Sequence, residues 1–202
     1  AAALSFQLPE ISNPVIFTGS QRSPDRPSSD AHLNLEGAAK AAMSDLGEIS
    51  IAMHETTDDL NVAIWRGNRT RKNHSSKRDA FTSLNDEPIG IVSEKIEWKG
   101  KYRPTCEKTV IKSGFDEKIA LVWAHPGFNS GDWENVTSSK KGVVIAGTGL
   151  GHINSNLLES IGKTAKDMPV AMSTQCLAGT TNLNVYRNGR KLIEKGVVET
   201  HD

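Results

Sequence analysis

The chain has 202 residues, of which 37% are hydrophobic and 24% charged, with 24 basic side chains balanced by 24 acidic ones. This composition fits a globular protein that can bury a substantial core, in one large domain or two small ones. Zero net charge argues against bulk nucleic-acid binding, and no apolar run reaches the roughly 18–20 residues needed to span a bilayer. Two widely separated cysteines, Cys106 and Cys176, argue against a disulfide framework and favour a reducing cytoplasm.

Short apolar runs in the first half of the chain predict strands around one helix. Strands are expected at residues 14–19, 49–53, 60–65, 89–92 and 96–98. The tight turn between the second and third of these indicates an antiparallel hairpin. The helix is expected to begin after Ser29 or Asp30, either of which can cap it, and to stop at Gly47.

A basic stretch at residues 66–78 follows the third strand and holds six Lys/Arg side chains within thirteen residues. One interpretation is a solvated loop, and a second is phosphate contact through Arg69 and Arg71. A third is a partly desolvated lysine whose cationic neighbours lower its proton affinity, so that it can serve as a general base. Charge alone does not decide among the three.

The second half of the chain predicts alternating strands and helices after an irregular stretch. Residues 99–118 have no clear period and are predicted as a linker between a unit at 1–98 and a unit at 119–202. Beyond the linker, strands are expected at 119–123, 142–146 and 169–172, and helices at 129–138 and 154–166. Continuous apolar strands alternating with helices indicate an α/β fold with a parallel sheet covered on both faces.

Three local motifs are candidates for chemistry. Gly147–Gly151 forms a tight, ligand-facing strand-to-helix turn, but His152 stands where a dinucleotide fingerprint needs glycine. His152 can therefore meet a ligand, or it can be a surface histidine at a helix N-terminus. His54-Glu55 starts a near match to a zinc motif in what is predicted to be a solvated turn, and Cys176 is predicted as a buried structural thiol because it lacks flanking glycines.

Separated segments of the chain resemble the L-asparaginase family and, within it, the D subunits of archaeal glutamyl-tRNA(Gln) amidotransferases, which are asparaginase-like glutaminases. These segments are residues 14–22, 28–35, 66–74, 78–83, 147–152, 173–176, 182–186 and 189–192. The resemblance covers nearly the whole chain and is weakest at 99–118. It implies an asparaginase-like fold of two α/β units with parallel-rich sheets, both of them incomplete in this chain.

The resemblance also assigns site residues. By its position in the motif, Lys72 is the catalytic lysine. Ser20, His152 and Tyr186 are expected to bind substrate, although asparaginases carry Asn at the position of His152. No metal site and no cofactor are expected in this chain.

The function implied is that of a glutaminase subunit in a tRNA-dependent amidotransferase. A threonine would form an acyl-enzyme with glutamine, and the ammonia would pass to an E-type partner subunit. That partner would use ATP and Mg²⁺ to convert Glu-tRNA(Gln) into Gln-tRNA(Gln). A cytoplasmic homodimer that does not contact membranes is implied.

The two threonine motifs of the family, T-G-G-T and H-G-T-D-T, do not occur in the 202 residues. The resemblance therefore implies an internal fragment, inactive alone, with the Thr–Asp pair upstream of Ala1 and more C-terminal domain beyond Asp202. Two alternatives stay open. The chain can belong to a free-standing L-asparaginase, or it can act without catalysis as a dimerisation or docking module.

Overall fold

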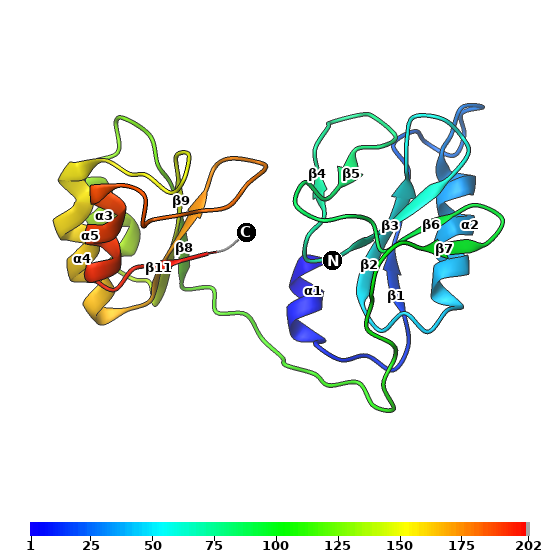
Figure 1. Cartoon of the computed structure of the whole chain (residues 1–202), viewed down its shortest axis with the longest axis horizontal. Helices are drawn as coiled ribbons and strands as arrows, with labels where there is room; N and C mark the ends of the chain where they lie inside the picture. Colours follow the sequence, from blue (N-terminus) through cyan, green and yellow to red (C-terminus); the bar gives the residue numbers. More distant parts are fainter. Residues whose placement is uncertain (201–202) are drawn as a thin grey trace. The chain divides into compact units, whose positions relative to one another are not determined.

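The computed structural model describes residues 1–200 as two compact units, Ala1–Gly114 and a second unit that begins at Phe115 (Figure 1). Each unit has its own sheet and its own hydrophobic core. Within the described part of the chain, no helix has both the length and the apolar character that a membrane span requires.

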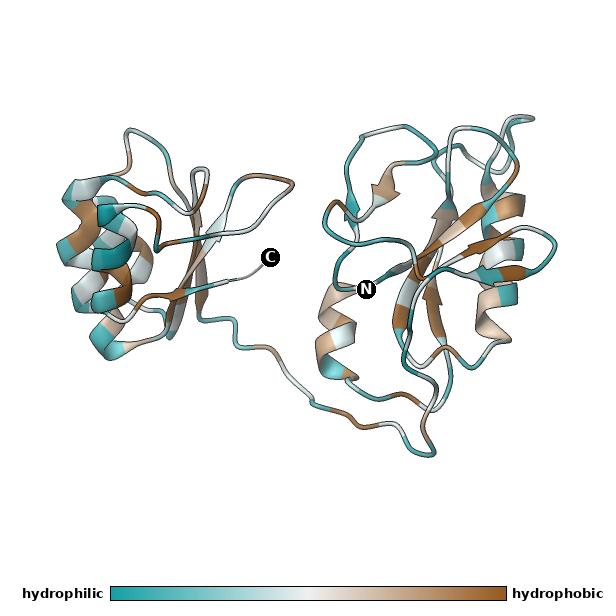
Figure 2. Ribbon diagram, in the orientation of Figure 1, coloured by the Kyte–Doolittle hydropathy of each residue, from teal (hydrophilic) through white to brown (hydrophobic). Residues whose placement is uncertain are grey.

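A five-stranded mixed sheet forms the centre of the first unit. Its strands, in spatial order, are β1 (Val15–Phe17), β2 (Ile49–His54), β3 (Val62–Arg66), β6 (Gly90–Val92) and β7 (Ile96–Trp98). Only β1 and β2 pair in parallel, and the predicted antiparallel pairing of β2 with β3 is confirmed. The central strands are largely apolar (Figure 2), which follows from their continuous hydrophobic runs. A short α1 (Ala2–Gln7) precedes the sheet.

Helix α2 (Ala31–Ala42) packs its small side chains on this sheet, with Ala38 and Ala41 in one cluster with Val62. The helix ends five residues before the predicted stop at Gly47. Ser44 explains the early end, because its Oγ donates to the carbonyl of Ala41 and accepts from the N–H of Leu46. A serine side chain competes in this way with helical backbone bonds.

Residues 99–118, predicted as a linker, lie mostly along the first unit. Backbone hydrogen bonds join Gly47 to Arg103, Thr105 to Asp45, Cys106 to Ile11 and Lys112 to Gln7. The division between the two units falls after Gly114. The segment has no hydrophobic period because it is held by backbone hydrogen bonds and isolated bridges, which leave no periodic pattern in the sequence.

Gly47 lies directly against this segment, and its N–H donates to the carbonyl of Arg103. A Cβ at Gly47 would lie 2.1 Å from the carbonyl oxygen of Pro104, so we expect Gly47→Ala to lower the free energy of unfolding by about 1–3 kcal/mol through overpacking. Gly100→Ala is the matched control, since a Cβ there meets nothing within 4 Å. Urea unfolding of the two variants checks this, and equal stabilities would contradict the close approach.

The second unit holds a wholly parallel sheet of four strands. Their spatial order is β11 (Val198–Glu199), β10 (Val170–Thr174), β9 (Gly142–Gly147) and β8 (Ile119–Trp123). Helices connect them: α3 (Ser130–Thr137), the 3-10 turn η1 (Ser155–Leu157), α4 (Leu158–Asp167) and α5 (Arg187–Glu194). Asn129 starts α3 with a capping box, in which its side chain and that of Asp132 each accept a backbone N–H.

The prediction that this sheet is covered on both faces is wrong for residues 115–200. All three α-helices lie on one side of the sheet in Figure 1. On the other side, Leu121 is 70% exposed and Trp123 53% exposed. The continuous apolar run correctly indicated two apolar strand faces, but no described segment of this unit covers the second one.

Candidate functional site

A pocket of about 400 Å³ in the first unit brings together several residues singled out by the sequence. It is lined by Ala1, Phe17, Thr18, Gly19, Ser20, Gln21, Ile51, Met53, Lys72 and Phe81. Its walls are the loop that leaves β1, the sheet strand β2, and the small two-stranded sheet of β4 (Arg71–Lys72) and β5 (Phe81–Thr82). The structure thus places Lys72 and Ser20 on one pocket.

Lys72 is fixed within the pocket by its strand. It pairs with Phe81 across the antiparallel β4–β5 ladder, and its Nζ lies 5.6 Å from the centroid of the Phe81 ring. A ring face at this distance attracts an ammonium group. Phe81 thereby orients the amine. The only signal for this contact in the sequence is that Phe81 lies close to Lys72 along the chain.

Three other basic side chains of the stretch are directed away from Lys72. Arg66 pairs with Glu48 and Asp86, and Arg78 pairs with Asp59. Arg71 precedes Lys72 on the same strand, so its side chain projects to the opposite face. Lys72 is exposed, and the described residues do not supply the desolvation on which the third interpretation relied. Arg69 and Arg71 are exposed as well, as contact with phosphate would require.

A buried aspartate shapes the loop that carries Ser20. The carboxylate of Asp30 accepts hydrogen bonds from the backbone N–H groups of Gln21 and Arg22 and from Asn34 Nδ2. Asp30 therefore does not cap α2 with its side chain, and Ser29 Oγ instead accepts from the N–H of Ala31. Burial by itself raises the pKa of Asp30, but the backbone hydrogen bonds and the nearby His54 hold that pKa below its ordinary value of 3.8.

This lowered pKa predicts acid sensitivity. Ionised Asp30 stabilises the folded chain fully when the pH is above 3.8, the ordinary pKa of the carboxyl group. This stabilisation is lost as the pH falls through the lower pKa that Asp30 has in the folded chain. We therefore expect the free energy of unfolding to fall on acidification below about pH 4, and to fall less steeply in Asp30→Asn. Urea titrations at several pH values check this, with Asp25→Asn in the exposed loop as control. An unchanged slope in Asp30→Asn would contradict it.

The second unit brings the other two predicted substrate residues together. The rings of His152 and Tyr186 lie edge to face with centroids 4.6 Å apart. His152 also lines a hollow of about 280 Å³ at the carboxyl ends of β8 and β9, with His125, Thr148 and Asn154. Ligands of parallel α/β sheets bind at this end of the strands, so the hollow is a second candidate ligand-binding site.

The glycine-rich turn before His152 is as tight as the sequence predicts. A Cβ at Gly147 would lie 2.8 Å from the carbonyl carbon of Gly151, and Gly149 and Gly151 have φ of 51° and 104°. Thr148 and His152 exchange two backbone hydrogen bonds across the turn. The next helical residue is Ser155, so His152 is not the helix N-terminal residue of the alternative interpretation.

Two sequence expectations about single residues are wrong. His54, expected in a solvated turn, is the last residue of β2 and is 0% exposed. The sequence did hold a signal for this, because His54 follows Ser50 and Ala52 at every second position and so shares their buried face of the strand. Cys176, expected to be buried, is exposed, and both cysteines are free. Within residues 1–200, no cluster of three His, Cys, Asp or Glu side chains could hold a metal ion.

Family models match both units. The model described as asparaginase, N-terminal, matches residues 1–104, and the glutaminase/asparaginase C-terminal domain matches residues 118–202. The chain belongs to the asparaginase family. Solved structures agree: the thermostable L-asparaginase from Thermococcus kodakarensis is 31% identical with a TM-score of 0.90, over 100% of this chain and 60% of that one.

Asparaginase-family relatives with a more specific name are also similar over the whole chain. The D subunit of glutamyl-tRNA(Gln) amidotransferase from Pyrococcus furiosus is 45% identical over 100% of this chain and 48% of its own length. Its counterpart from Thermoplasma acidophilum is 40% identical over 98% of this chain and 49% of its own length. The chain thus spans about half the length of these relatives. The predicted resemblance and the asparaginase-like α/β fold are confirmed.

Proposed function

We propose that the whole protein is a glutaminase subunit that supplies ammonia to a tRNA-dependent amidotransferase. One observation carries the proposal: Lys72 and Ser20, both assigned by motif position, line one pocket in an asparaginase-family unit. The proposal is also supported by the whole-chain similarity to the amidotransferase D subunits of Pyrococcus furiosus and Thermoplasma acidophilum.

The proposed reaction is amide hydrolysis through an acyl-enzyme. The hydroxyl oxygen of a threonine outside these 202 residues attacks the side-chain amide carbon of glutamine, while Lys72 Nζ accepts the hydroxyl proton. The leaving nitrogen takes this proton from Lys72 Nζ as the C–N bond breaks, so it departs as ammonia and the amine is free again. Water, activated by the same amine, hydrolyses the ester and releases glutamate. Because Lys72 is exposed, the aspartate of the family's H-G-T-D-T motif is proposed to exchange protons with Lys72 Nζ during the reaction.

Within the pocket, Ser20 and the loop residues beside it are proposed to hold the substrate. The second unit's His152 and Tyr186 are proposed to contact substrate bound by the other subunit of a homodimer. Their edge-to-face packing gives a preformed aromatic wall. His152 replaces the asparagine of asparaginases, so the α-amino group of the substrate is expected to be held differently.

In the complex, the ammonia would pass to an E-type partner subunit that activates Glu-tRNA(Gln). ATP and Mg²⁺ would be bound by that partner. The exposed Arg69 and Arg71 are proposed to meet tRNA phosphates. Substitution of either should weaken tRNA binding and leave glutamine hydrolysis unchanged, because neither lines the pocket.

Two other functions remain in competition. A free-standing L-asparaginase is favoured by the structural match to the Thermococcus kodakarensis enzyme. A docking module without catalysis would be folded and inactive.

Ammonia release by the whole protein, measured with glutamine and asparagine in parallel, separates these functions. We expect release from glutamine, and co-purification with a partner subunit when the two are expressed together. Release from asparagine by a protein that purifies alone would favour the asparaginase. Release from neither amide by a folded protein would overturn both enzymatic functions.

A further inference from the structure

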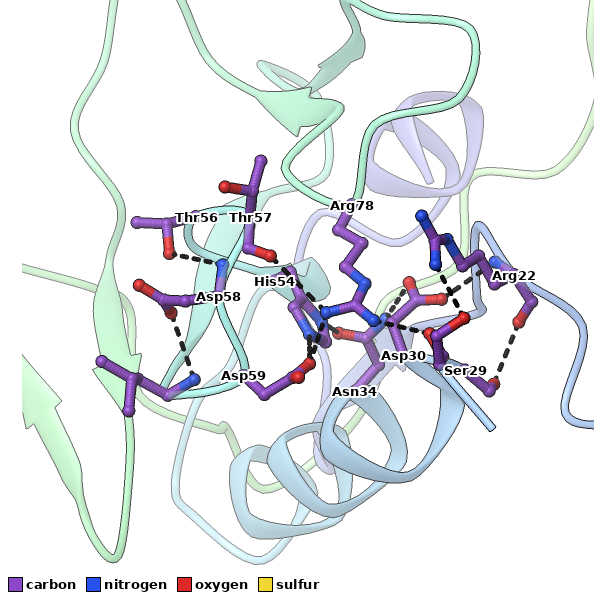
Figure 3. A network of polar contacts seen from close by, with 12 residues as sticks. Arg22, Ser29, Asp30, Asn34, His54, Thr56, Thr57, Asp58, Asp59 and Arg78 are labelled. Atoms are coloured by element: carbon purple, nitrogen blue, oxygen red, sulfur yellow. Dashed lines mark hydrogen bonds and ion pairs between the residues drawn. The ribbon is translucent and has the colours of Figure 1, made fainter. Parts of the chain in front are cut away.

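A chain of polar side chains joins the loop after β1, the loop between β2 and β3, and the loop between β4 and β5 (Figure 3). His54 and Asn34 are 0% exposed and Asp30 is 1% exposed. They connect to Asp59, in the loop between β2 and β3, and through it to Arg78, in the loop between β4 and β5. The proposed mechanism uses none of these five side chains.

One end of the chain holds the loop that carries Ser20. Asn34 Nδ2 donates to the carbonyl of Gly19 at 2.9 Å and to Asp30 Oδ2 at 3.1 Å. Asp30 in turn accepts from the backbone N–H groups of Gln21 and Arg22. Gly19 and Gln21 both line the pocket, so this end fixes one wall.

The other end holds the hairpin that carries Lys72. The guanidinium of Arg78 donates to Asp59 Oδ1 at 2.6 Å, to the carbonyl of Ser28 at 2.6 Å and to the carbonyl of Thr57 at 3.5 Å. Its side chain is only 14% exposed. Arg78 follows Lys72 on the loop that returns to Phe81, so it ties the opposite pocket wall to the same network.

The hydrogen-bond partners also fix the tautomer of His54. Both groups that face Asn34 Nδ2, the Gly19 carbonyl and the Asp30 carboxylate, can only accept hydrogen bonds. They settle the orientation of the amide, so Asn34 Oδ1 must accept a hydrogen bond from its own neighbour. It lies 2.6 Å from His54 Nδ1, which must therefore carry the proton. His54 Nε2 faces Asp59 Oδ1 at 3.4 Å, and a proton taken up at Nε2 would be donated to that carboxylate. The charged groups of the network around His54 are Asp30, on the α2 side, and the Asp59–Arg78 pair.

We propose that Arg78, Asp59, His54 and Asn34 form a positioning relay that sets the Lys72 hairpin against the Gly19–Arg22 loop, with His54 locked as its Nδ1–H tautomer by Asn34. These are positioning residues, since none of them lines the pocket. The kinetic consequence rests on the proposed glutaminase function, whereas the tautomer of His54 does not.

The tautomer is tested on the 202-residue chain by ¹⁵N NMR of the imidazole rings, with His54→Gln used to assign the signals. We expect a protonated Nδ1 across the titration, with only Nε2 gaining and losing a proton. An unprotonated Nδ1 at any pH at which the chain is folded would overturn the relay. Asn34→Asp, which can accept without donating to Gly19, should keep the Nδ1 proton and release the Gly19–Arg22 loop to faster amide exchange.

The positioning role is tested in the whole protein with Arg78→Ala, against Lys77→Ala in the same loop as control. We expect Arg78→Ala to lower kcat for glutamine about 10–100-fold with little change in KM, because a misplaced amine slows proton transfer more than it weakens binding. Arg78→Lys should restore kcat only in part, since a lysine cannot reach all three acceptors. Equal kcat in Arg78→Ala and Lys77→Ala would overturn the proposal. An inactive wild type would refute the glutaminase function and leave the NMR test of the relay standing.

Discussion

Lys72→Ala in the whole protein is expected to reduce glutamine hydrolysis by about 10³-fold or more, because it removes the proposed proton acceptor for the nucleophile. Steady-state ammonia release measures the loss. Lys72 is exposed and its Nζ lies 5.6 Å from the centroid of the Phe81 ring, so the free energy of unfolding should change by no more than about 0.5 kcal/mol. The variant should also keep the oligomeric state of the wild type.

Lys77→Ala supplies the control for this variant. It removes an exposed lysine from the loop that follows Lys72, between β4 and β5, and Lys77 lies outside the residues that line the pocket. We expect wild-type turnover from it. Near-normal turnover by Lys72→Ala would refute the role assigned to that amine, whereas equal losses in both variants would point to the charge of the loop as a whole.

Trp133→Ala is expected to give the largest loss of stability, about 3–5 kcal/mol in the second unit. Trp133 lies in α3, is 1% exposed, and packs in the core cluster with Ile145 and Leu157. Its Nε1 also donates to Thr164 Oγ1 of α4 at 2.9 Å. The substitution therefore leaves a large cavity where two helices meet the sheet and removes a hydrogen bond between them.

Hydrogen exchange followed by mass spectrometry measures this loss within one molecule. Amides of β9 and β10 should exchange faster in Trp133→Ala, and amides of β2 and β3 in the first unit should serve as the internal reference. Trp133→Phe keeps most of the packing, and Thr164 Oγ1 still donates to the carbonyl of Ser160. We expect Trp133→Phe to cost only about 1–2 kcal/mol, and a cost equal to that of Trp133→Ala would contradict the packing explanation.

The sequence predicted the elements whose signal is local. The parallel strands of the second unit and the antiparallel β2–β3 pair follow from apolar runs and from turn length. Element ends were harder to predict, since Ser44 ends α2 through a side-chain hydrogen bond that no hydrophobic period shows. The exposure of one face of β8 could not be predicted either, because the sequence of a strand shows which of its faces are apolar and not what covers them.

The candidate site divides in the same way. Lys72, Ser20, His152 and Tyr186 come from motif order, and the structure brings them together as two pairs, one in each unit. The groups that place Lys72 could not be predicted. Phe81 meets Lys72 only because a short hairpin pairs their strands, and Arg78 meets Asp59 only because two separate loops lie side by side. The run of charge did not show this either, because Arg66 and Arg78 are turned toward carboxylates in other loops, Glu48 and Asp59.

Reaction of the whole protein with glutamine in the presence of hydroxylamine tests the central claim most directly. Because an acyl-enzyme partitions between water and hydroxylamine, we expect γ-glutamyl hydroxamate alongside glutamate from the wild type and neither product above background from Lys72→Ala. Hydroxamate formed at the wild-type rate by Lys72→Ala would contradict the claim that Lys72 drives acyl transfer at this pocket.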